Sequence, residues 1–258
     1  MLIIRQEQME VFDAAAWRAF EDQMVAHLAD FRPLLCQSIG QEQMRRVIRR
    51  GIESARGYGF DRRGPMRLYL ELMLVLGSAF DTDPQYPWAG EILKERDSGS
   101  QMDRAERLYE RVIDYQFQVA GPDDVYRLKA LTNIRAFASQ PLNFAPNDLV
   151  PFMLDEIGLI YPEKAAFLGS EALMALILKR QLGARNQRLT TPRGMALVVM
   201  LMLGFGHGCG GDPLYPWIGE ILRDKSTSDP DAKAKLLEEN ALLWVGYVVA
   251  DTRQTERS

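Results

Sequence analysis

Apolar residues of this chain recur every three or four positions, which is the spacing of one face of an α-helix. Residues 6–31 and 41–58 each carry such a face, the first followed by Pro33 and the second ended by Gly57 and Gly59. The apolar positions of these two segments are Met9, Phe12, Ala16, Phe20, Met24 and Leu28, then Met44, Val47, Ile48 and Ile52. No segment has the strict alternation of a half-buried strand. The pattern predicts an all-α protein.

The remaining helices follow from the same periodicity and from Pro and Gly signals. We expect a helix over 66–76, a short turn of helix over 91–94 and, after the polar loop 95–100, a helix over 103–119. Later in the chain, we expect helices from Asn147 to Ile160, from Ser170 to Leu182, after Thr191–Pro192, and over 232–250. Residues 251–258 are expected to fray.

One sequence motif occurs twice. Residues 83–93 read DPQYPWAGEIL and residues 212–222 read DPLYPWIGEIL, with nine identities in eleven positions at an offset of 129. Matching methionines, leucines and a glycine extend upstream at the same offset. Self-similarity at a fixed offset indicates a repeated structural unit. The sequence therefore predicts two helical units of about 125 residues, 1–130 and 145–250, joined by a linker at 131–144 and packed as a pseudo-twofold pair.

The repeated motif is expected to make a rigid connection, because proline fixes its own φ and an Asp side chain can bond nearby N–H groups. Its structural residues are Pro84, Pro87 and Trp88 with the copies Pro213, Pro216 and Trp217. We expect each tryptophan to fill the gap between the third and fourth helices of its unit. The alternative is that this loop presents Asp81, Asp83 and Glu91 to a partner.

Charge and apolar content narrow the class of protein. The chain has 258 residues, 31 Lys and Arg, 35 Asp and Glu, and a net charge of -4. An acidic balance disfavours nucleic acid as the main partner and suits a basic protein. Arg45, Arg46, Arg49 and Arg50 are interpreted as the solvated face of a helix. The longest apolar run, 195–205, is too short to cross a membrane, and no secretory signal is visible, so we expect a cytoplasmic protein without membrane contact.

No combination of residues has the pattern of a catalytic or metal site. Cys36 and Cys209 are expected to be free thiols in apolar surroundings. His207 and Cys209 lie together in a glycine-rich turn, but a Cys–His enzyme also needs an orienting third group. Asp81 and Asp83 lack the glycine and distal Glu of a calcium loop. We therefore expect no cofactor, no metal and no enzymatic activity.

Three segments carry a resemblance to a known group of proteins: IIRQEQMEVF, RRGIESARGYGF and LGSAFDTDPQYPWAGEIL. They resemble small helical proteins encoded in Proteobacteria beside type VI secretion spike and toxin genes. The resemblance implies an immunity protein that binds and neutralises a cognate effector toxin, with a nuclease as the case that an acidic chain suits. The alternative that it implies is an adaptor or chaperone that loads an effector on the spike.

An inhibitory surface would be expected at an acidic loop edge, since charge steers association with a basic partner. The candidate residues are Asp81, Asp83, Glu91, Glu95 and Asp97, with Asp212, Glu220 and Asp224 in the second unit. Which unit binds the toxin, and whether the protein is a monomer or a homodimer, stay open at this point.

Overall fold

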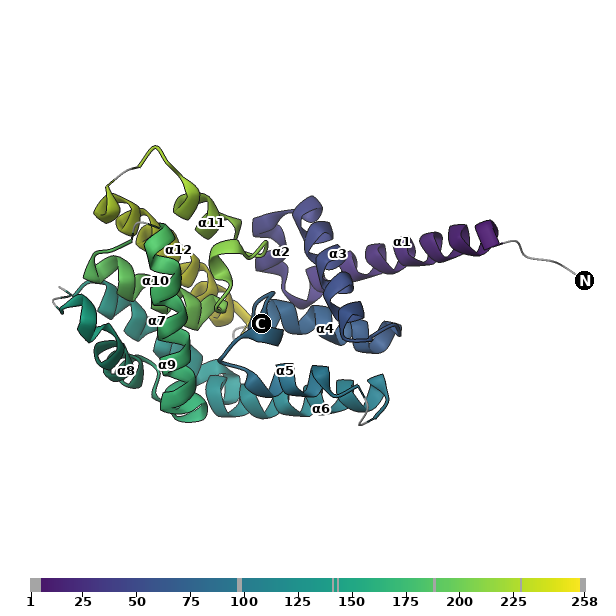
Figure 1. Cartoon of the computed structure of the whole chain (residues 1–258), viewed down its shortest axis with the longest axis horizontal. Coiled ribbons are helices and arrows are strands. Elements are labelled where there is room, and N and C mark those ends of the chain that lie inside the picture. Colours follow the sequence, from purple (N-terminus) through teal and green to yellow (C-terminus); the bar gives the residue numbers. More distant parts are fainter. Residues whose placement is uncertain are drawn as a thin grey trace, which may run out of the picture.

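The structure, a computed structural model, describes residues 6–96, 99–140, 142, 144–187, 189–227 and 229–255. All regular elements within these ranges are helical, which confirms the predicted all-α class (Figure 1). None of the helices in this part of the chain has both the length and the apolar content that a membrane span requires.

The first half of the molecule, α1 to α6, ends in a π-helical turn. Its helices are α1 (Gln6–Phe31), α2 (Pro33–Ile39), α3 (Gln41–Gly57), α4 (Arg63–Leu76), η1 (Phe80–Thr82), α5 (Pro87–Lys94), α6 (Gln101–Tyr115) and the π-turn η2 (Gln116–Ala120). Most match the expected segments. The sequence did not indicate α2, because Pro33 read as a stop; it is instead the first residue of a new helix, where proline needs no N–H partner.

The second half, α8 to α12, follows a connecting region that contains η3 (Pro122–Asp124) and α7 (Val125–Ala138). Its helices are η4 (Pro146–Asp148), α8 (Leu149–Ile160), α9 (Pro162–Gln187), α10 (Pro192–Phe205), η5 (Cys209–Gly211), α11 (Pro216–Arg223) and α12 (Pro230–Thr255). Three expectations differ from the structure. The expected helix from Ser170 to Leu182 is part of α9, which already begins at Pro162. Residues 131–138 of the expected linker belong to α7, and the last helix continues to Thr255.

Several elements of the two halves begin and end at positions 129 apart. This holds for α4 and α10, for η1 and η5, and for α5 and α11. The long helix α9 contains a kink at Gly169 with φ 73° and ψ 166°. Gly40, 129 residues earlier, has φ 76° and ψ 162° and separates α2 from α3. The kinked α9 thus has the same local backbone as the α2–α3 pair.

A buried cationic side chain lies at the C-terminus of each of the short helices α5 and α11, at equivalent positions. Arg104 of α6 donates to the Leu93 carbonyl at 2.7 Å, and Lys233 of α12 donates to the Leu222 carbonyl at 3.3 Å. Both side chains are buried. A cation at a helix C-terminus satisfies carbonyls that have no partner within the helix. The core that surrounds these contacts is apolar and extends through both halves.

Candidate functional site

The loops that carry the repeated motif cross at the centre of the molecule. Asp83 accepts a hydrogen bond from the backbone N–H of His207 at 2.6 Å, and Asp212 accepts one from the backbone N–H of Ser78 at 2.8 Å. Since 207 and 212 are 129 above 78 and 83, the two contacts are reciprocal. Asp212 also accepts from the Ser78 hydroxyl at 2.5 Å. Each half therefore supplies a carboxylate to the other.

Two glycines let the backbones approach at this crossing. Gly77 has φ 99°, and a Cβ added to it would lie 2.8 Å from the Phe205 carbonyl oxygen. Gly206 has φ 89°, and its Cβ would lie 3.2 Å from the Leu76 carbonyl oxygen. A side chain is disfavoured at both positions by the positive φ and by the lack of space. The crossing thus explains why both motifs are preceded by glycine.

These contacts correct part of the predicted partner surface. Asp83 and Asp212 are only 2% and 6% exposed, and their oxygens are used inside the chain. Burial raises the pKa of Asp212, although the hydrogen bonds from Ser78 and Leu214 oppose that rise. The two carboxylates do not face a partner in this structure. Asp81 is half-buried and accepts from the hydroxyls of Tyr58 at 2.9 Å and Tyr69 at 3.1 Å.

The other acidic candidates lie at the surface in different places. Glu91 and Glu220 are exposed on α5 and α11. Glu95 bonds Arg107 of α6 at 2.6 Å. Asp224 accepts from the backbone N–H of Ser226, which lowers its pKa. Asp97 lies outside the described residues. The structure therefore does not gather the seven described candidates into one surface.

The proline and tryptophan positions agree with the expected structural role. Pro87 and Pro216 are the first residues of α5 and α11. Trp88 is buried and Trp217 half-buried, the latter in edge contact with Phe205. Pro84 and Pro213 are half-buried in the crossing loops, and the Pro213 carbonyl accepts from Gln43 at 3.0 Å. The motif forms the connection between helices in each half.

The turn with His207 and Cys209 takes part in the same crossing. His207 Nδ1 lies 3.2 Å from an Asp83 oxygen, without the geometry of a hydrogen bond. Burial raises the pKa of the Cys209 thiol to about 12, whereas a nucleophilic cysteine needs a lowered pKa. Cys36 is also a free thiol, with its pKa raised to about 11 by burial. Within the described chain, no group of three His, Cys, Asp or Glu could hold a metal ion.

An apolar stripe lies on the outer face of α6 and continues into η2. It consists of Met102, Tyr109, Ile113 and Phe117, which follow one another at intervals of seven, four and four residues. Tyr109 is 55% exposed and Phe117 71%. The adjacent face of α6 fills the core through Leu108 and Val112. A helix that is apolar on two faces usually has a second neighbour. The sequence contains this second apolar face, but the apolar residues of the buried face alone were enough to predict the helix.

In the second half, the corresponding face of α12 is covered by another helix. α12 packs against α10, α11 and α7, whereas α6 packs against α4, α5 and its own π-turn. The residues 129 after Tyr109 and Ile113 are Glu238, which pairs with Arg193 at 2.7 Å, and Leu242. No described helix lies on α6 as α7 lies on α12, and Figure 1 shows α1 running straight away from the body. The α6 stripe is thus the uncovered counterpart of a covered face.

The α6 stripe borders a groove of about 380 Å³. Phe31, at the end of α1, lines this groove together with Tyr109 and Ile113 and is itself exposed. Glu106 and Glu110 are exposed one turn along α6 from the stripe. Arg32 and Arg127 also line the groove, so it combines apolar and aromatic side chains with charged residues of both signs, as many protein interfaces do.

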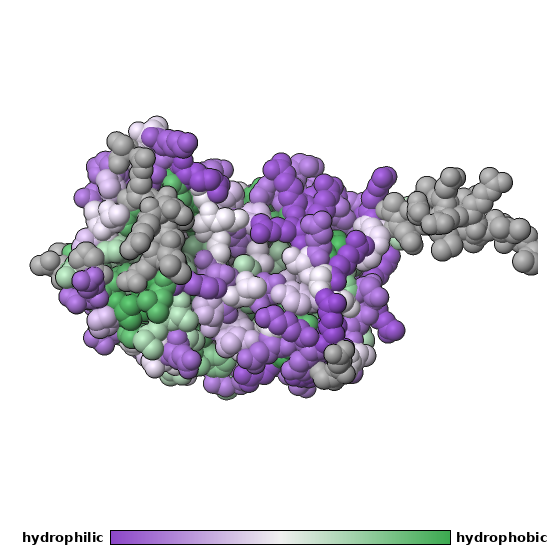
Figure 2. Space-filling view, in the orientation of Figure 1, coloured by the Kyte–Doolittle hydropathy of each residue, from purple (hydrophilic) through white to green (hydrophobic). Residues whose placement is uncertain are grey.

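A second apolar surface lies on the other half of the molecule. Figure 2 shows a hydrophobic area over α8 and α9. Leu159, Met174 and Leu178 are the exposed large apolar side chains of these two helices within the described residues. We refer to them as the α8–α9 face. Single exposed leucines are ordinary, whereas apolar side chains that gather on one surface are found at interaction sites.

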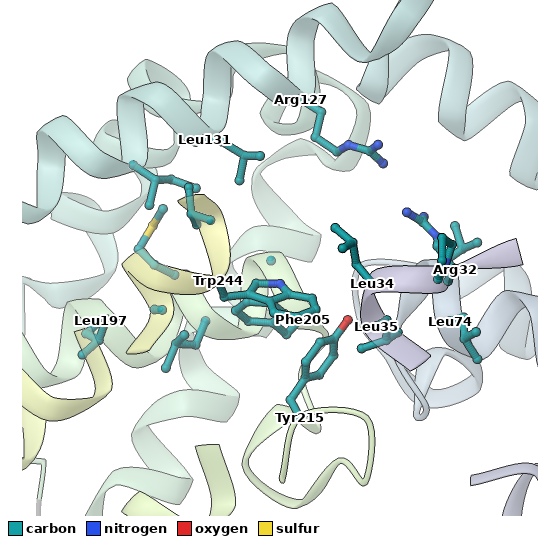
Figure 3. A pocket seen from close by; sticks show the side chains of 18 residues that line it. Arg32, Leu34, Leu35, Leu74, Arg127, Leu131, Leu197, Phe205, Tyr215 and Trp244 are labelled. Atoms are coloured by element: carbon teal, nitrogen blue, oxygen red, sulfur yellow. The ribbon is translucent and has the colours of Figure 1, made fainter. Parts of the chain in front are cut away.

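An apolar cavity lies between the two halves. It has a volume of about 270 Å³ and is lined by apolar side chains of α2, α4, α7, α10 and α12, with Phe205, Tyr215 and Trp244 at its centre (Figure 3). Arg32 and Arg127 point toward each other at one end. Arg127 pairs with Asp124, whereas the Arg32 guanidinium has no hydrogen-bond or ion-pair partner in the described chain. We call this space the two-arginine cavity.

No protein-family model, curated protein or solved structure matches the chain.

Proposed function

We propose that this chain is a protein-binding immunity protein that neutralises a cognate type VI secretion effector, with a nuclease as the expected toxin class. The observation that supports it is the α6 stripe, an apolar helix face that is exposed where its counterpart on α12 is covered by α7. A partner helix laid on α6 would bury the stripe in the way that α7 buries the face of α12. This is the helix-in-groove mode of recognition.

The electrostatics of the surface fit a basic partner. The chain has a net charge of -4, and Glu106 and Glu110 stand beside the stripe. Acidic side chains at the rim speed association with a basic protein, while apolar anchors at the centre slow dissociation. In this proposal, Tyr109 and Phe117 are the anchors. Glu91 and Glu95 lie on the side of α6 that carries Arg107 and Arg111, away from the stripe.

We also infer that the two halves arose by duplication and pack as a pseudo-twofold pair. The reciprocal contacts of Asp83 and Asp212 support this, because in a twofold interface each contact occurs twice with its partners exchanged. Gly208 and Ala79, also 129 apart, face each other, since a Cβ on Gly208 would lie 3.1 Å from that of Ala79. An approximate axis between these two residues would account for both observations.

The test is a growth assay in a susceptible bacterium that expresses the adjacent effector gene, with and without this chain, followed by a pull-down of the pair. We expect the chain to restore growth and to form a stable complex. Tyr109→Glu should abolish both, because it puts a charge at the centre of the apolar surface and copies Glu238 of the second half. Leu243→Glu, at an exposed leucine of α12, is the matched control and should keep both.

Failure of the wild-type chain to restore growth would contradict the immunity function. Unchanged rescue by Tyr109→Glu would contradict the assignment of the α6 stripe. Circular dichroism of both variants separates a lost interface from a lost fold.

An effector-loading adaptor is the second candidate, and the α8–α9 face is the observation that favours it. An adaptor must bind the effector and the spike at once, and this protein has apolar surfaces on both halves. In that case deletion of the gene would stop effector secretion without self-intoxication. Leu178→Glu would reduce binding to the spike protein and leave binding to the effector intact.

A further inference from the structure

We propose that the two-arginine cavity binds a small amphipathic monocarboxylate, with a medium-chain fatty acid as the type of ligand. The carboxylate would lie between Arg32 and Arg127, and the hydrocarbon would lie against Phe205, Trp244 and Leu197. This inference goes beyond the proposed function and does not depend on a protein partner.

Among the described residues, the corresponding place in the other half has no unpaired cation. The residues 129 after Arg32 and Leu35 are Tyr161 and Lys164. There the Tyr161 hydroxyl donates to the Val119 carbonyl at 2.8 Å, and the Lys164 ammonium donates to the Leu203 carbonyl at 2.6 Å. Both polar groups are thus satisfied within the chain.

Aromatic side chains also fill the counterpart of the cavity in the other half. Tyr115, the counterpart of Trp244, packs edge-on against Tyr86 and Phe167, with ring centroids 5.3 Å apart in each pair. Gly204 and its counterpart in the first half, Val75, both line the cavity, and a Cβ added to Gly204 meets no atom within 4 Å. The same architecture is therefore filled on one side and open on the other.

The charged side chains at one end of the cavity are not balanced. Arg32 is half-buried and without a partner, and burial beside Arg127 lowers its pKa. Arg127 is paired with Asp124 and keeps a buried Nε without a hydrogen bond. The two arginines and one aspartate leave one positive charge at the end of an apolar space. A single carboxylate balances that charge, and a guanidinium can bind it through two parallel hydrogen bonds.

The size and the lining of the cavity suit a hydrocarbon chain. The cavity has about 270 Å³. An engineered apolar cavity of roughly 150 Å³ in another protein holds a benzene molecule, so this one is large enough for a longer hydrocarbon. Its lining is mostly Leu, Met, Val and aromatic side chains. Convergent polar groups at one end of an apolar pocket are the usual arrangement of a small-molecule site.

The experiment is a calorimetric titration of the purified full-length chain with sodium decanoate. We expect one binding site, and we expect decyltrimethylammonium, which has the same chain length and the opposite charge, not to bind. Arg32→Gln should weaken decanoate binding about tenfold or more, because a charge-assisted hydrogen bond is lost. Arg46→Gln, at an exposed arginine of α3, is the matched control and should bind as the wild type does.

A second variant tests the space itself. Gly204→Leu places a side chain in the open part of the cavity and should abolish decanoate binding without lowering the melting temperature. Gly158→Leu, at a helical glycine of α8 with equally free surroundings, is its control and should bind normally. Absence of decanoate binding at about 1 mM, a concentration that still detects weak ligands, would overturn the proposal. Equal binding of the cationic amphiphile, or unchanged binding by both cavity variants, would overturn it as well.

Discussion

The two halves of this protein have several helices of the same length and spacing, but they differ in which helix faces are covered by other helices. α4, η1 and α5 match α10, η5 and α11 in length and spacing, and the loops after α4 and α10 exchange carboxylates at the centre. Yet α7 covers α12 while the α6 stripe stays exposed, and a cavity is open on one side while its counterpart is filled. Features present in both halves explain the fold. Features present in one half are the places where binding is to be sought.

The strongest test of the shared plan concerns the crossing carboxylates. Asp83→Ala and Asp212→Ala should each lower the free energy of unfolding by about 3 kcal/mol, because each leaves buried N–H groups of both halves without an acceptor. The similarity of the two losses is the essential expectation. Urea denaturation measures them, with Asp155→Ala at an exposed position of α8 as control. A large loss for one variant and none for the other would contradict the reciprocal arrangement.

The glycines of the crossing sharpen the comparison. Gly77→Ala should cost about 2 kcal/mol, because a positive φ is strained for alanine and the new Cβ meets a carbonyl at 2.8 Å. Gly206→Ala should cost less, since its nearest carbonyl oxygen lies at 3.2 Å.

Gly57, which ends α3 with free surroundings, supplies the control. There alanine should be neutral or stabilising, by up to about 1 kcal/mol. Thermal melts of the three variants give the order, and a Gly206→Ala loss larger than that of Gly77→Ala would refute the stated geometry.

The smallest expected effect is a difference in pH dependence at Asp212. Its pKa is raised above the ordinary 3.8 by burial, so the folded state binds the proton more tightly than the unfolded state. The stability that this group adds is fully present below 3.8 and is lost as the pH rises through the folded pKa. Between pH 7 and pH 4, the wild type should therefore gain stability relative to Asp212→Asn. Urea midpoints across this range test it, and a gap that narrows on acidification would show the opposite sign.

Periodicity predicted most of the helices, because each needs one apolar face toward the core. It missed α2, where Pro33 begins a helix rather than ending one, and α7, which was assigned partly to the linker. The repeat identified the motif but did not show what its aspartates contact. Asp83 and Asp212 were expected at a surface, and only the crossing of two distant loops shows that they are buried.

The candidate binding surfaces depend on tertiary packing, so the periodicity of the sequence could not predict them. Met102, Tyr109 and Ile113 have the spacing of a helix face, but whether another helix covers that face is decided by the course of α1 and α7. The two-arginine cavity joins Arg32 to Trp244, from opposite ends of the chain. Neither residue has a local pattern that indicates a pocket.

The most direct test of the central claim, that the uncovered α6 face binds the partner, is hydrogen–deuterium exchange of the chain with and without its cognate effector. We expect slower exchange in α6 and at the end of α1 near Phe31, with no change in α12. Protection of α12 or of the α8–α9 face without α6, or no protection anywhere, would contradict it.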